Sequence, residues 1–121
     1  MTRDRGEAVR REVLGDEYVD DAAATSDELT ADFQDFITRY AWGEVWDRPG
    51  LGRRERSIAT LAVLVTLRAD DELALHVRAA LRNGLTPEEI KETLLHTAVY
   101  AGVPAARSAF QIAQRVIAEA G

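Results

Sequence analysis

The chain has 121 residues, which is long enough for one compact domain with its own hydrophobic core. Its formal net charge of -6 at pH 7 argues against nucleic acid and anionic membranes as partners. It contains no cysteine, which excludes disulfides, thiolate metal sites and thiol nucleophiles.

The sequence shows no signal for export or membrane insertion. Residues 1–15 lack the apolar core of a secretory signal. The longest apolar run, residues 58–67, is shorter than the roughly 20 residues that a membrane-spanning helix needs. We therefore expect a soluble, cytoplasmic protein.

The first part of the chain predicts two helices. Residues 4–14 predict a helix that ends at Gly15. In the next segment, a helical spacing places five apolar residues on one stripe: Leu29, Phe33, Phe36, Ile37 and Tyr40. Pro49-Gly50 then indicates a turn.

The rest of the chain predicts four more helices and no strand. Residues 53–68 form a helix whose second half is apolar nearly all round, which suggests a central position. Residues 71–83 follow, with Asp70 as a plausible N-cap and Gly84 just after the end.

The clearest helix start is the capping box Thr86-Pro87-Glu88-Glu89, in which threonine is the N-cap and the second glutamate is the N3 residue. This helix ends at Gly102, and the last one begins at Pro104. The sequence therefore predicts an all-α, single-domain bundle of about six helices.

One of only two histidines, His76, lies within an apolar helical pattern. On a helical wheel Leu73 and Val77 belong to the core face, whereas Glu72, His76 and Asn83 share one flank of it. A carboxylate four residues before a histidine can orient the ring and raise its pKa. The alternative is an ordinary pair on the helix surface.

The other histidine, His96, shares a polar arc with Glu89, Glu92 and Tyr100. This pattern is typical of a solvated or intersubunit face. No metal site is expected, because the chain has neither an HExxH motif nor a recognisable ligand set.

The segment 46–57 is a positive island in an acidic chain. It contains Arg48, Arg53, Arg54 and Arg56, begins at Trp46, and follows Trp42 by four residues. Guanidinium groups bind carboxylates through two hydrogen bonds, and indole rings can form an apolar wall, so the segment suits a small organic anion. Alternatively, the arginines pair with acids on neighbouring helices and the tryptophans belong to the core.

Three motifs, AWGEVWDRPGLGRRERS, ELALHVRAALRNG and EEIKETLLHTAVYAGVPAA, together resemble the carboxymuconolactone decarboxylase family. The motifs are most similar to the branch that acts on 4-carboxymuconolactone. The resemblance covers residues 30–115 as a family core, with residues 1–28 as an N-terminal helical extension of one domain 1–121.

The resemblance implies an all-helical homo-oligomer, usually a hexamer built as a trimer of dimers, with neither metal nor organic cofactor. Relatives of the alkylhydroperoxidase type carry a CxxC pair before the histidine that matches His76. Here those two positions are Ala69 and Glu72, which excludes the dithiol mechanism.

The implied reaction is the decarboxylation of 4-carboxymuconolactone to 3-oxoadipate enol-lactone and CO2, in the breakdown of protocatechuate. We expect His76 to deliver the proton, with Glu72 orienting it, and one of Arg53, Arg54 or Arg56 to anchor the second carboxylate of this dicarboxylate lactone. Trp42 and Trp46 are expected to keep the pocket dry. The alternatives are an enzyme of the same fold that acts on another small carboxylated lactone, and a non-catalytic oligomeric module that binds a ligand.

Overall fold

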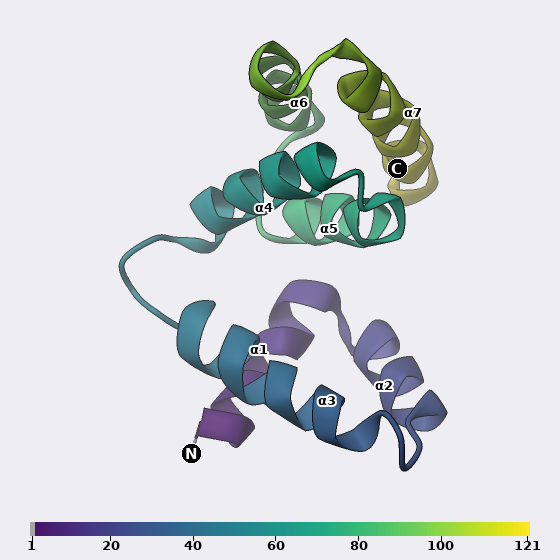
Figure 1. Cartoon of the computed structure of the whole chain (residues 1–121). Coiled ribbons are helices and arrows are strands. Elements are labelled where there is room, and N and C mark those ends of the chain that lie inside the picture. The colour runs from purple at the N-terminus through teal and green to yellow at the C-terminus, as the bar shows by residue number, and fades with distance from the viewer. Residues whose placement is uncertain (1) are drawn as a thin grey trace. The chain divides into compact units, whose positions relative to one another are not determined.

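The computed structural model describes residues 2–121, and its regular structure is entirely helical, as predicted (Figure 1). The described residues form seven α-helices and one π-helical segment, rather than about six helices. They divide into two compact units, Met1–Leu51 (unit 1) and Gly52–Gly121 (unit 2).

Unit 1 contains helices α1 (Thr2–Leu14), α2 (Asp16–Thr25) and α3 (Ala31–Ile37) and the π-helical segment η1 (Thr38–Val45). Helix α1 ends just before Gly15, as predicted, and packs against η1. In η1 the backbone hydrogen bonds join residues five positions apart instead of four. The Trp46 N–H, for example, donates to the Ala41 carbonyl oxygen at 2.9 Å.

The additional helix is α2, which the sequence analysis did not predict. Val19 is its only buried residue, and acidic or small residues make up most of the remainder. A helix that buries so little has no apolar stripe, and periodicity therefore gives no signal for it.

Two glycines allow α1 and η1 to cross with their backbones in contact. A Cβ atom built on Gly6 would lie 2.0 Å from the Thr38 carbonyl oxygen, and one built on Gly43 would lie 2.5 Å from the Thr2 carbonyl oxygen. Real Cβ atoms do not approach backbone oxygens this closely. The crossing therefore requires glycine on both elements.

Unit 2 consists of helices α4 (Arg53–Leu67), α5 (Asp70–Arg82), α6 (Pro87–Ala101) and α7 (Val103–Ala120). Their boundaries agree with the predicted helices within a residue or so, although Ala69 rather than Asp70 occupies the N-cap position of α5. Helix α4 is central, as predicted, because it contacts α5, α6 and α7. The largest fully buried side chains of this core include Leu61, Val65, Leu73, Val77, Ile90, Leu94 and Val116.

The predicted capping box at the start of α6 is confirmed. The Thr86 hydroxyl accepts a hydrogen bond from the Glu89 N–H at 3.1 Å, and the Glu89 carboxylate accepts one from the Thr86 N–H at 2.9 Å. Two N–H groups that would otherwise lack a partner inside the helix are satisfied in this way.

We expect Thr86→Ala to lower the free energy of unfolding by about 1 kcal/mol, because the Glu89 N–H loses its acceptor. Thr86→Ser keeps the hydroxyl and serves as the matched control. Urea unfolding followed by far-ultraviolet circular dichroism measures both variants. Equal stability of Thr86→Ala and the parent protein would contradict a stabilising cap.

Candidate functional site

His76 lies in the middle of α5, between the buried residues Leu75 and Val77, and is itself half-buried. Burial lowers the pKa of its imidazole from 6.5 to about 4. This is opposite to the rise that we expected from Glu72, which is exposed one turn earlier. The desolvation of the ring decides its charge, so the ring is neutral at pH 7 in the unliganded protein.

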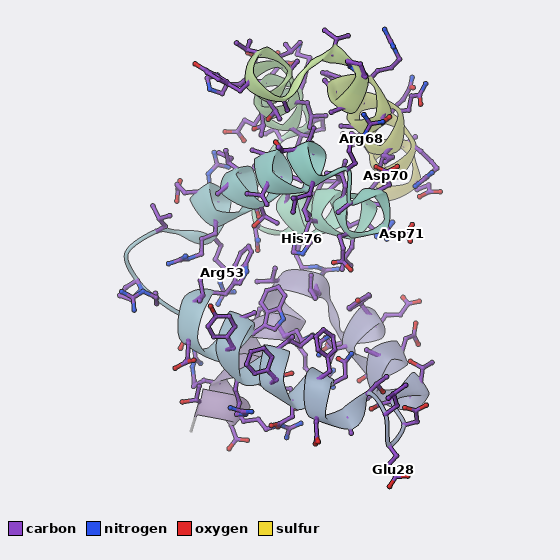
Figure 2. The ribbon with its side chains drawn as sticks, in the orientation of Figure 1. Glu28, Arg53, Arg68, Asp70, Asp71 and His76 are labelled. Carbon is purple, nitrogen blue, oxygen red and sulfur yellow. The ribbon has the colours of Figure 1, made fainter. Side chains whose placement is uncertain are left out.

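The three candidate anchoring arginines occupy the first turn of α4, and Figure 2 shows Arg53 and His76 extending from the same side of the α4–α5 pair. Arg53 and Arg56 are both half-buried. The N-terminus of α4 adds the positive end of a helix dipole to this arginine turn. This end of unit 2 is therefore suited to a carboxylate.

Arg54 pairs with an acidic residue on a neighbouring helix, which was the alternative to a role in substrate binding. Its guanidinium forms two hydrogen bonds with the Glu89 carboxylate and donates to the Gly84 carbonyl oxygen at 2.5 Å. The guanidinium lowers the pKa of the Glu89 carboxyl to about 2, and Thr86 contributes to this shift. Arg54 thus connects α4 to the α5–α6 turn and to the capping box.

A polar contact holds the arginine turn against the end of α5. The Asn83 side-chain amide donates to the Ser57 hydroxyl at 2.9 Å, and Ser57 is buried one turn after Arg53. His76 lies seven residues before Asn83, or about 10 Å along the helix axis. Asn83 shares the flank of His76 on the helical wheel, but the wheel could not predict this contact, because its partner Ser57 lies on another helix.

Trp42 and Trp46 belong to unit 1, whereas the arginine turn, Glu72 and His76 belong to unit 2. The two indoles stack with ring centroids 5.2 Å apart, at an interplanar angle of 29°. Trp42 is only 6% exposed, and Trp46 is half-buried. Trp42 therefore fits the alternative of a core residue, and Trp46 retains some accessible surface.

His96 is exposed on α6, as its polar arc predicted. Its ring tilts against Tyr100 with centroids 5.4 Å apart. It lines a groove of about 370 Å³ between α4 and α6, together with Ile58, Glu88 and Glu92. The acidic lining makes this groove unsuitable for a dicarboxylate.

Residues 2–121 offer neither a metal-binding cluster nor a membrane-spanning helix. They contain no group of three or more histidine, aspartate or glutamate side chains arranged to hold a metal ion. None of their helices has the length and apolar character required to cross a bilayer.

The sequence is similar to known proteins over most of its length. The profile described as "Carboxymuconolactone decarboxylase family" matches residues 31–115. A 4-carboxymuconolactone decarboxylase from Acinetobacter baylyi is 47% identical over 117 residues, which cover 97% of this chain and 87% of that protein.

Two other relatives extend the comparison. A nitrosuccinic acid decarboxylase from Metarhizium robertsii is 46% identical over 94% of this chain and 80% of its own length. An uncharacterised 15.0 kDa protein from Paracoccus denitrificans is 35% identical over 64% of this chain and 60% of that protein.

Proposed function

Since the chain belongs to the carboxymuconolactone decarboxylase family, we propose that it is a carboxy-lyase that converts 4-carboxymuconolactone to 3-oxoadipate enol-lactone and CO2. The observation that carries this proposal is the 47% identity to a decarboxylase of that name across nearly the whole chain. The half-buried histidine and the arginine turn of unit 2 supply groups that the reaction needs.

The chemistry requires an acceptor for electrons, a proton and a binding group for the second carboxylate. When the bond between the ring carbon and the departing carboxylate breaks, its electron pair moves through the ring onto the lactone carbonyl oxygen. Protonation of the carbon next to that carbonyl then gives the enol-lactone. The ring itself accepts the electrons, and the protein's tasks are to bind, to exclude water and to supply a proton.

His76 is the proposed proton donor. Its ring is neutral in the free protein because its pKa is lowered to about 4. A bound dianion favours the imidazolium form electrostatically, so we propose that the ring gains its proton when substrate binds. Glu72, although exposed, remains the proposed orienting group, since it lies one helical turn from His76.

We expect binding of an unreactive dicarboxylate analogue near pH 7 to take up as much as one proton per site. The reason is that the pKa of His76 rises from about 4 in the free protein as the dianion binds. Calorimetry in two buffers of different ionisation enthalpy measures this uptake, and His76→Gln should abolish it. Binding heats that are independent of the buffer would contradict a proton donor charged by the substrate.

For anchoring we favour Arg53 and Arg56, which are half-buried in the first turn of α4, at the positive end of its helix dipole. Arg54 has a structural role, because it holds Glu89 and Gly84. We expect Arg53→Ala or Arg56→Ala to raise KM roughly tenfold or more, as for a lost charged hydrogen bond. Arg54→Ala should instead lower the melting temperature. Steady-state kinetics and thermal unfolding separate the two effects, and unchanged KM in both of the first two variants would contradict the anchoring role.

The decisive test of the function is a substrate panel with the purified protein. It includes 4-carboxymuconolactone, other carboxylated lactones and nitrosuccinate, because the nitrosuccinic acid decarboxylase is nearly as similar as the lactone enzyme. Nitrosuccinate also has two carboxylates and an electron-accepting group on the carbon that loses CO2. Preference for nitrosuccinate would overturn the lactone assignment, and binding without turnover would favour the non-catalytic module.

We further propose that the protein forms a homo-oligomer, with a hexamer built as a trimer of dimers as the expected form. Support comes from large apolar side chains that the single chain leaves exposed on unit 2. Val99 and Tyr100 on α6 are 75% and 81% exposed, and Leu95 and Val103 are exposed beside them. An apolar face of this kind on a protein usually marks an interface.

A further inference from the structure

Unit 1 carries a row of exposed apolar side chains that its own core does not use. The row, here named the aromatic stripe, consists of Leu29, Phe33, Phe36 and Tyr40, which are 87%, 59%, 49% and 53% exposed. Phe36 and Tyr40 stack with ring centroids 5.4 Å apart. Phe33 and Phe36 lie on α3, Tyr40 lies on η1, and Leu29 lies in the turn before α3. Apolar side chains that follow one another along a helical segment are the kind of anchor that inserts into a groove.

Acidic residues accompany this stripe. Asp27, Glu28 and Asp32 are all exposed, and Glu28 extends outward from the turn before α3 in Figure 2. Asp35 is already paired with Arg3 and Arg39. The surface around the N-terminal half of the stripe is therefore apolar with a negative border.

Unit 2 carries a surface of the opposite kind. A groove of about 580 Å³ runs between α6 and α7, and Ile90, Leu94, Phe110 and Ile117 provide its apolar lining. Two cations, Lys91 and Arg107, also line it, and both are exposed. Lys91 contacts Glu88 at 2.8 Å, but an exposed pair of this kind contributes little and can exchange partners.

We propose that the aromatic stripe of one copy of this chain docks into the α6–α7 groove of a second copy. The stripe offers apolar anchors in helical spacing with carboxylates beside them, and the groove offers an apolar lining with cations. The volume is within the range of sites that hold compact organic groups, so it can take two or three of these side chains. This inference rests on the self-association proposed above and does not depend on the reaction.

Because the two surfaces differ, the contact is head-to-tail. Each copy then uses its stripe on one neighbour and receives the stripe of another neighbour in its groove. Such a contact closes into a ring when the rotation between copies permits. It would leave the exposed face of α6 around Val99 and Tyr100 available for a different, twofold contact.

Cross-linking tests the pairing directly, because the chain has no cysteine and engineered thiols are the only ones present. We expect an oxidised mixture of Phe33→Cys and Gln114→Cys chains to give a disulfide-linked dimer that contains one of each. Gln114 is an exposed residue that lines the groove. A mixture of Asp21→Cys, on the exposed surface of α2, with Gln114→Cys is the matched control and should not cross-link.

Charge reversal provides a second, independent readout by analytical ultracentrifugation. Arg107→Glu should weaken self-association about tenfold or more, and so should the pair Glu28→Arg and Asp32→Arg. Combining all three reversals in one chain restores opposite charges and should recover association. Circular dichroism establishes that each variant is folded.

Three results would overturn the proposal. The first is a parent protein that stays monomeric at every concentration. The second is a Phe33→Cys/Gln114→Cys chain that closes its disulfide within itself at high dilution, which would mean that the stripe occupies its own groove. The third is self-association that the single charge reversals leave unchanged.

Discussion

Replacing His76 by alanine is expected to lower kcat roughly 100- to 10,000-fold, the usual cost of losing a group that transfers a proton in the transition state. KM should change far less, because the carboxylate anchors lie on another helix, in the first turn of α4. The measurement is steady-state kinetics with 4-carboxymuconolactone at neutral pH.

The chain contains a matched control for this experiment, since His96 is its only other histidine. His96 is exposed on α6, in an acidic groove. His96→Ala should retain the parental kcat, and a His76→Gln variant reveals how much of the loss comes from the missing proton rather than from a cavity. A His76→Ala enzyme with near-parental kcat would remove His76 from the mechanism.

A second large effect is expected in unit 1, where Gly6→Ala should lower the free energy of unfolding by about 3 kcal/mol. The added methyl group would lie 2.0 Å from a backbone oxygen, that of Thr38, so α1 and η1 must move apart. A flexible side chain could rotate away, but a hydrogen-bonded backbone cannot. Gly43→Ala should act in the same direction, through Thr2.

The chain offers a convenient probe of this effect, because both of its tryptophans, Trp42 and Trp46, lie in unit 1. Urea unfolding followed by tryptophan fluorescence therefore reports on unit 1. Gly50→Ala is the control, since nothing lies within 4 Å of a Cβ at that position. A Gly6→Ala protein that unfolds at the parental urea concentration would mean that the two elements cross with more room than the structure shows.

The helix boundaries of unit 2 were predictable because they depend on local chemistry. Thr86 and Glu89 satisfy each other's backbone N–H groups within four residues of chain, so the sequence alone reveals the start of α6. Gly84, with a φ of 99°, follows the end of α5 for a similarly local reason. The family resemblance was also contained in local motifs, and the profile match to residues 31–115 confirms it.

The candidate site was predictable only as a set of residue types. The sequence shows that Arg53, Arg54 and Arg56 are close together in the chain and that Glu72 is four residues before His76. The predicted rise in the pKa of His76 was wrong. Its pKa is lowered, because the desolvation of the ring outweighs the effect of an exposed carboxylate. The pairing of Arg54 with Glu89 joins residues 35 positions apart, beyond any periodic pattern.

By itself the sequence determined that this protein is helical, where most of its helices begin and end, and which family it belongs to, because periodicity, caps and motifs are properties of neighbouring residues. Only the tertiary structure decided which apolar residues are buried. Leu61 and Val65 are inside, whereas Phe33 and Phe36, which also lie on an apolar helical stripe, remain exposed. A helical stripe specifies a face, but what covers that face depends on segments distant in the sequence. The tertiary structure likewise decided that Gly6 and Gly43 must be glycines, because the reason is the close approach of two helices.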